Sequence, residues 1–210
     1  MDATTARNPG RRSELSPNQR HKRQQIVNAA RAVLADKGIA ACTEREVAAA
    51  SPLTKSAVHY YFADMNDLID QAMAGHVDAF VADLRAAATN AAPGQTLWAV
   101  VDAYLATFRA QPRAALLWFE FWIHSSRTER LAAVATIEDS VINLLAEALG
   151  DLGRPPPQSR PTVARAVYAL LGGTIVEQST RPAHPAEVRA RIEALISPDA
   201  PRAPIPTPGA

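Results

Sequence analysis

Apolar side chains recur at helical intervals from about residue 17 onward. One face of the first predicted helix carries four of them: Ile26, Ala30, Val33 and Leu34. Gly38 follows Asp36-Lys37 and favours the left-handed residue that closes a helix. The pattern predicts a first helix that begins near Pro17 and ends at Gly38.

Two short helices are predicted next. Thr43 stands three residues before Glu46, so its hydroxyl can cap a helix over about 43–50 while Glu46 reaches back to the backbone. Pro52 prevents this helix from continuing, because proline lacks the N–H and pushes the preceding residue out of the α region. Thr54 can then cap a third helix that reaches Phe62.

The third helix is two-faced. At about 100° per residue, one side collects apolar and aromatic groups and the other collects polar groups. The inner residues are Ala57, Val58, Tyr61 and Phe62, and the outer residues are Lys55, Ser56, His59 and Tyr60. We expect the inner side to pack on the first helix and the outer side to face a partner.

The rest of the chain keeps the helical spacing and contains no alternating strand pattern. Six further helices are predicted over about 64–88, 97–108, 113–124, 128–149, 162–180 and 184–196. The predicted fold class is all-α, with a three-helix N-terminal helix-turn-helix head and a C-terminal helical body of about six helices. The head spans 18–63 and the body 64–196.

The two ends differ from the rest in composition. Residues 1–17 are polar and basic, and residues 197–210 include five prolines, so both are expected to be disordered. Residues 1–17 hold no apolar leader segment, and the longest dense apolar run, 116–123, is far shorter than the roughly 20 residues that span a bilayer. A soluble, cytoplasmic protein is expected, with no membrane partner.

Cys42 is the single cysteine of the chain, which excludes an internal disulfide and a cysteine-based zinc site. A small, half-buried residue before a helix is the favoured interpretation, with a redox switch as the alternative. No metal site and no cofactor are predicted.

Charge separates the chain at Phe62. Residues 1–62 carry ten Lys and Arg against five Asp and Glu, a net charge of +5, whereas residues 63–210 carry twelve against sixteen, a net charge of −4. A basic head on an acidic body suggests a polyanion partner for the head, most often nucleic acid. For Arg7, Arg11 and Arg12 alone, a merely soluble tail is the favoured interpretation.

The outer side of the third helix suits the major groove of DNA. Small neighbours such as Ser56 let a helix enter a groove about 12 Å wide, where polar side chains meet base edges. The second helix can aim its N-terminal N–H groups and Thr43 at a phosphate. The predicted DNA-binding residues are Lys22, Thr43, Arg45, Thr54, Lys55, Ser56, His59 and Tyr60.

The head resembles that of the tetracycline-repressor (TetR) family without a gap over about 45 residues. The matching segments are Ile26-Val27-Asn28-Ala29-Ala30, Gly38, Thr43, Val47-Ala48, Leu53-Thr54-Lys55, Val58-His59-Tyr60-Tyr61-Phe62 and Leu68. The resemblance implies a homodimer of all-helical subunits that binds a palindromic double-stranded DNA operator and leaves it when a small-molecule inducer binds the body. His59 to Phe62 with Asp64, and the stretch 118–122, are similar to the choline/betaine regulators of this family.

Three positions depart from the family pattern. Ser51-Pro52 replaces Ala-Gly in the turn, Ser56 replaces a glycine, and Met65 replaces a lysine that would contact phosphate. These changes affect the expected angle and affinity of the third helix. Arg20, Lys22 and Arg23 are expected to compensate by contacting the DNA backbone.

The body is rich in aromatic side chains, which a family with a pocket between these helices would use as its lining. The predicted ligand-binding residues are His76, Phe80, Trp98, Tyr104, Phe108, Trp118, Phe121, Trp122, Glu120 and Tyr168. Any one of these aromatic residues, taken alone, is better explained as an ordinary core residue than as a ligand contact. Glu120 either helps to hold a cationic ligand or faces solvent or an arginine. His76 is either a hydrogen-bonded core histidine or a ligand contact.

The last two predicted helices are apolar on too many sides for a free surface. We predict a dimer interface of two helices from each subunit, made by Val163, Val167, Leu170, Thr174, Val188, Ile192 and Leu195.

Two other function classes fit the sequence less well. A helical enzyme that processes small molecules would need a metal-ligand pair, a nucleophile motif or a phosphate loop, and the sequence has none, so no catalytic residue is predicted. A constitutive DNA-binding protein would not need such a large aromatic body. The prediction is a ligand-responsive transcriptional regulator of the repressor type.

Overall fold

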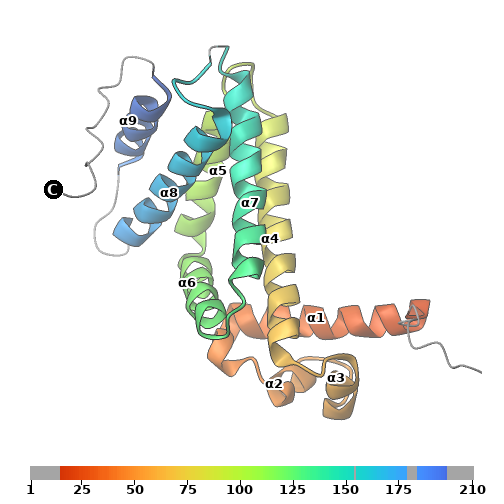
Figure 1. Ribbon diagram of the computed structural model, residues 1–210. Helices are drawn as coiled ribbons and strands as arrows, with labels where there is room; N and C mark the ends of the chain where they lie inside the picture. The colour runs from red at the N-terminus through yellow and green to blue at the C-terminus, as the bar shows by residue number, and fades with distance from the viewer. Residues whose placement is uncertain (1–14, 154, 179–183, 198–210) are drawn as a thin grey trace, which may run out of the picture. The chain divides into compact units, whose positions relative to one another are not determined.

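The structure is a computed structural model, which describes residues 15–153, 155–178 and 184–197. Over these residues it is built of helices and short 3₁₀ turns and contains no strand, which confirms the predicted all-α class (Figure 1). The predicted basic arm before residue 15 and the tail after residue 197 lie outside the described residues. The chain divides into two compact units, residues 1–72 and 73–210.

The first unit holds three helices and the start of a fourth: α1 (Pro17–Lys37), α2 (Glu44–Ala49), α3 (Lys55–Tyr61) and the first turns of α4 (Met65–Thr89). Ser16 begins α1 with a capping box, in which its hydroxyl accepts from the Gln19 N–H while the Gln19 side chain accepts from the Ser16 N–H. Gly38 ends α1 at a φ of 77°, which an L side chain rarely adopts.

Thr43 caps α2 as predicted, since its hydroxyl accepts from the Glu46 N–H at 3.3 Å. The reciprocal half of the predicted capping box is wrong. The Thr43 N–H donates to the Ala41 carbonyl at 2.8 Å, and the Glu46 carboxylate instead binds Lys37 Nζ at 2.7 Å. The contact with Lys37 lowers the pKa of Glu46 and raises that of the lysine.

The core of the first unit draws one apolar face from each helix. Its buried members include Ile26 and Leu34 of α1, Val47 of α2, Val58 of α3 and Leu68 of α4. The unit ends at Ala72, past the predicted boundary at residue 63, because the first turns of α4 contribute Leu68 and Ile69 to buried positions.

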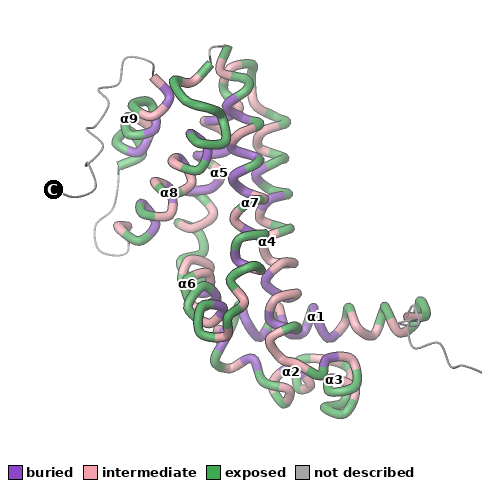
Figure 2. Tube along the Cα trace, in the orientation of Figure 1, coloured by how far each residue is buried: buried purple, intermediate pink, exposed green. Residues whose placement is uncertain are grey.

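The second unit contains the rest of α4 and five further helices. They are α5 (Thr96–Ala110), α6 (Pro112–Arg127), α7 (Leu131–Ala148), α8 (Arg160–Gln178) and α9 (Pro185–Ile196). Helix α7 packs against α5, α6 and α8, and α8 also packs against α9. Figure 2 shows buried positions running along α5 and α7, while α9 keeps an exposed outer side.

Within the described part of the chain, no helix combines the length and the apolarity needed to cross a membrane.

Candidate functional site

The α3 helix presents one polar surface and one buried surface. Thr54 caps it by accepting from the Ala57 N–H at 3.3 Å. Val58 is fully buried and Phe62, the C-terminal cap, is 3% exposed. Lys55, Ser56, His59 and Tyr60 are all exposed, Tyr60 by 71%. The helix is held from behind and offers a cation, a hydroxyl, an imidazole and a phenol outward.

A carboxylate lies among these outward groups. Glu44, the first residue of α2, has its oxygens 3.5 Å from Lys55 Nζ and 3.4 Å from His59 Nδ1. The sequence reasoning did not select Glu44, although a glutamate directly after the cap Thr43 is the signal that could have found it. The contacts limit the free movement of two side chains on the α3 surface.

The other predicted residues of the polar surface also lie in the first unit. Thr43, Arg45 and Thr54 are exposed, and the Arg45 side chain, 86% exposed, lies 3.5 Å from a Glu46 oxygen. Lys22 of α1 is half-buried. Seven of the eight predicted DNA-binding residues are therefore open to a partner, and Lys22 is partly so.

Arg23 does not take the outward position expected for a backbone contact. Its Nη1 donates to Gln71 Oε1 at 2.6 Å, and its Cζ lies 4.4 Å from the centroid of the Phe62 ring. Arg23 lies one turn before Ile26, on the side of α1 that packs inward. The guanidinium therefore contacts the end of α3 and the second turn of α4.

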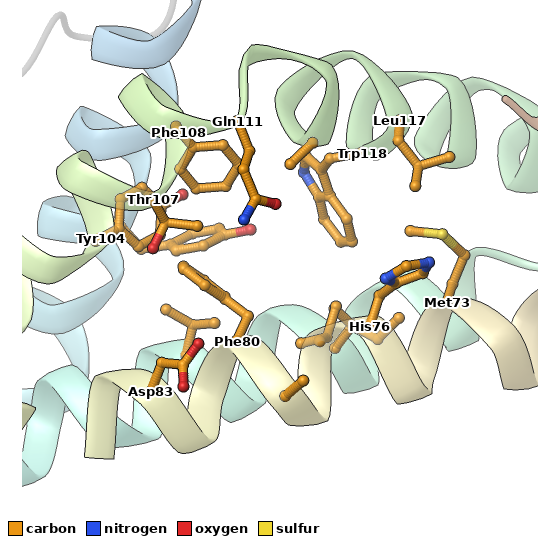
Figure 3. Close-up of a pocket in the computed structure, with 16 residues that line it drawn as sticks. Met73, His76, Phe80, Asp83, Tyr104, Thr107, Phe108, Gln111, Leu117 and Trp118 are labelled. Atoms are coloured by element: carbon orange, nitrogen blue, oxygen red, sulfur yellow. The ribbon is translucent and has the colours of Figure 1, made fainter. Parts of the chain in front are cut away.

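The second unit contains a cavity of about 260 Å³ lined by α4, α5, α6, α7 and α8. Figure 3 shows Trp118 pointing from α6 toward α4, where His76 points toward it and Phe80 points toward Tyr104 and Phe108. Phe80, Tyr104 and Phe108 form a three-ring cluster with centroid distances of 5.0–5.5 Å. The polar lining includes His76, Asp83, Thr107 and Gln111.

A second cavity of about 420 Å³ adjoins the first. The two share four lining residues: Tyr104, Phe108, Trp118 and Tyr168. The second adds Phe119 and Trp122 from α6, Glu138 from α7, and Gly172 and Gly173 from α8. Among the described residues that line the two cavities, carboxylates occur in both and neither Lys nor Arg occurs.

Burial alters the titration of the shared lining. It raises the pKa of Tyr104 and of Tyr168, so both phenols stay protonated. Burial also raises the pKa of Glu138, while a hydrogen bond from Tyr168 and the charge of Arg165 oppose that shift. The Tyr168 hydroxyl therefore donates to the Glu138 carboxylate, which Arg165 also attracts from outside the lining.

Three predicted ligand-binding residues do not line either cavity. Phe121 is fully buried behind Trp118, with ring centroids 6.0 Å apart. Trp98 packs against the core, and the Arg189 guanidinium lies 5.0 Å from its ring centroid. Glu120, on α6, points to neither cavity, because Trp118 and Phe121 take the inward positions of that turn.

The remaining seven predicted residues line one or both cavities: His76, Phe80, Tyr104, Phe108, Trp118, Trp122 and Tyr168. The reasoning missed Asp83 and Glu138. Asp83 lies one turn after Phe80, on the stripe that already contained His76, so helical spacing could have found it.

The predicted interface residues lie mostly inside the single chain. Val163, Val167, Thr174, Val188 and Ile192 are at most 3% exposed, and Leu170 and Leu195 are partly buried against the same core. Helices α5 and α7 pack against α8, and α8 packs against α9, so no partner is needed to bury them. What α8 leaves exposed includes Ala169, Gly173 and Val176, the last by 52%.

Comparison with known families gives a match over both units. Residues 26–72 match the family model for bacterial regulatory proteins of the tetR family. Residues 93–197 match the model for the C-terminal part of BetI-type transcriptional repressors. The chain is also 25% identical over 168 residues to the HTH-type transcriptional regulator BetI of Rhizobium meliloti (strain 1021), covering 77% of this chain and 80% of that protein.

Solved structures share the fold. A transcriptional-regulator structure from Streptomyces coelicolor A3(2) superposes with a TM-score of 0.71 at 19% identity, over 86% of this chain and 99% of the other. The multidrug binding protein EbrR, complexed with proflavin, superposes with a TM-score of 0.65 at 24% identity, over 83% of this chain and 99% of the other.

Proposed function

The chain belongs to the TetR family of transcriptional regulators, and from that premise we propose that it is a dimeric repressor that leaves a palindromic operator when a small molecule fills its aromatic cavity. The family assigns DNA binding to the N-terminal part and ligand binding to the C-terminal part. The proposal concerns which surfaces perform these tasks.

The observation that carries the proposal is the two-faced α3 helix. Its inner residues Val58 and Phe62 fix it in the unit, and its exposed residues are groups that hydrogen-bond to base edges or phosphates. Lys55 and Tyr60 are the groups proposed to reach the major groove. Thr43 and Arg45, at the start of α2, are proposed to hold the adjoining backbone.

Helix α4 supports the proposed link between ligand and DNA. It is a single helix from Met65 to Thr89. Its first turns contribute Leu68 to the head, and its later turns supply six residues of the first cavity, from Met73 to Asp83. A ligand that displaces α4 would alter the state of the head. Coupling of about 1–3 kcal/mol would weaken operator binding roughly 5- to 150-fold.

The lining favours an aromatic organic cation as the inducer. Aromatic faces attract cations, and the carboxylates of Asp83 and Glu138 lie in a lining that holds no described Lys or Arg. Glu138 takes the role first expected of Glu120. EbrR, a structural relative, was solved with proflavin. The neutral alternative is an aromatic inducer recognised by the rings and by Thr107 and Gln111 alone.

Dimerisation is proposed through the outer faces of α8 and α9. Ala169, Gly173 and Val176 form a small, apolar strip on α8 that also borders the second cavity, and α9 exposes Ala186, Ala190 and Ala194. Small side chains let helices approach closely, and a two-fold dimer presents two heads to half-sites about one helical turn apart.

The proposed activity is binding and release, with no catalytic step, and it takes place where the chromosome is, in the bacterial cytoplasm. The helical-enzyme alternative would require turnover of a ligand. Incubating the protein with a bound ligand and recovering that ligand chemically changed would favour the enzyme over the regulator.

The test starts from the wild-type protein. Random duplex DNA is selected for binding, and the enriched sequence is footprinted with and without compounds that raise the melting temperature. The proposal expects a palindromic site whose footprint fades with at least one such compound. A regulator of another kind would select no sequence, or would keep its footprint at saturation with every stabilising compound.

A further inference from the structure

We propose that Arg23 is a positioning residue that fixes the angle of the recognition helix α3 to helix α4, and so sets sequence specificity without contacting DNA. The inference rests on the proposed reading of DNA by α3. It differs from the expectation from sequence, in which Arg23 joins Arg20 and Lys22 on the phosphate backbone.

The geometry shows one guanidinium in contact with two elements. Phe62 ends α3, where its N–H donates to the Val58 carbonyl at 2.9 Å, and its ring is 3% exposed beneath the Arg23 guanidinium. Gln71 lies on the second turn of α4 and accepts from Nη1 at 2.6 Å. Together, the contact with the Phe62 ring and the hydrogen bond to Gln71 fix the orientation of the guanidinium plane.

These contacts use properties that only arginine combines. A planar guanidinium can stack on an aromatic face and still donate in its own plane, whereas a lysine ammonium is a point charge on a flexible stem. The side chain is half-buried, so its charge is partly shielded from a phosphate. The short turn at residues 62–64 joins α3 to α4, and Arg23 braces this turn from α1.

The position of Gln71 gives the contact a place in regulation. Gln71 precedes Met73, the first cavity residue on α4, by two residues, which is about 3 Å of helical rise. A displacement of α4 by a ligand would reach the Gln71 amide directly. Arg23 would then pass it to Phe62 and the end of the recognition helix.

The experiment compares Arg23→Lys, Arg23→Gln and Gln71→Leu in the full-length protein, with Lys22→Gln as the matched control from the next position on α1. Binding to the operator selected by the wild type, and to random-sequence duplex, is measured over a range of salt concentrations. Hydrogen exchange of residues 55–62 is measured on the same samples without DNA.

A positioning role predicts that Arg23→Lys and Arg23→Gln behave alike. Both should speed exchange in α3 roughly 2- to 30-fold and lower the ratio of operator to random-sequence affinity, with the salt slope unchanged. Gln71→Leu should give a smaller change of the same kind. Lys22→Gln should lower the salt slope by about 1 and leave α3 exchange as in the wild type.

A phosphate contact predicts the opposite pattern, which would overturn the proposal. In that case Arg23→Lys would bind as the wild type does, Arg23→Gln would lower the salt slope, and neither would change exchange in α3. Failure of the wild type to select any DNA sequence would contradict the proposed function instead. The hydrogen-exchange measurement would still show whether Arg23→Lys and Gln71→Leu loosen the packing of α3.

Discussion

Two substitutions on the last helices separate the core of the second unit from the proposed dimer surface. Ile192 is fully buried within one chain, whereas Val176 is 52% exposed. We expect Ile192→Ala to lower the free energy of unfolding and to leave the association of folded subunits intact. We expect Val176→Glu to abolish the dimer and to leave the fold of each subunit intact.

The size of the first effect follows from the burial of Ile192. The substitution removes three carbon atoms from a side chain that water does not reach, and each is worth about 0.8 kcal/mol of transfer free energy, so about 2.4 kcal/mol is lost before any cavity forms. The cavity term brings the expected loss to about 2–5 kcal/mol. At an exposed position such as 176, the direct effect on the fold of one subunit is expected to stay within about 0.5 kcal/mol.

Sedimentation and urea unfolding at several protein concentrations distinguish the two outcomes. Unfolding of a dimer shifts with protein concentration and that of a monomer does not. Ile192→Ala should unfold at lower urea while keeping the concentration dependence, and Val176→Glu should lose that dependence. A folded monomer of Ile192→Ala, or a wild-type dimer in Val176→Glu, would refute the assignment of these residues to core and surface.

Three further outcomes are expected. Lys55→Ala and Tyr60→Ala should each weaken operator binding in gel shifts, by about 1–3 kcal/mol where the side chain contacts a base. Their melting temperatures should stay near those of the wild type and of the exposed control Asn143→Ala, and wild-type affinity in both variants would contradict the role of α3. Glu138→Gln should weaken stabilisation by cationic compounds but not by neutral ones. Because burial raises the pKa of Glu138, the wild-type response to cations should fall as the pH drops through that raised pKa, and equal responses at all pH values would point to a neutral inducer. Asp151→Asn should lower the melting temperature at neutral pH, because the Thr96 hydroxyl and the Gly94 N–H bind the Asp151 carboxylate and lower its pKa. This stabilisation is present above the ordinary pKa of an aspartate and is lost as the pH falls through the lowered pKa. An unchanged melting temperature at neutral pH would show that this loop contact contributes nothing.

Local signals were sufficient to predict most of the fold. Helical spacing, Thr43 and Thr54 as caps, and Gly38 and Pro52 as stops depend on neighbours a few residues apart, and the observed helices follow them. The polar side of α3 was predictable for the same reason, since a two-faced helix of seven residues has its exposed groups fixed by the period of 3.6.

Contacts between distant segments were less accessible. Apolar residues such as Val167 and Ile192 showed that α8 and α9 are buried, but spacing does not say whether the same chain or a second copy buries them. Glu120 was chosen because aromatic residues surround it in sequence, yet helical geometry aims Trp118 inward and not Glu120. Arg23 resembled its basic neighbours until the structure placed Phe62 and Gln71 beside it.

The central claim is that a ligand in the aromatic cavity releases DNA from the head. It is tested most directly by titrating a stabilising compound while tryptophan emission and the anisotropy of labelled operator are recorded together. Trp118 is the reporter, because it lines both cavities, and Trp98→Phe serves as the matched control, because Trp98 lines neither. The account predicts that quenching and release follow one curve in the wild type and in Trp98→Phe. Trp118→Phe, which keeps only Trp122 in the cavity lining, should show a smaller quench and need more compound for release. Full release at wild-type concentrations in Trp118→Phe, or quenching without release in the wild type, would contradict it.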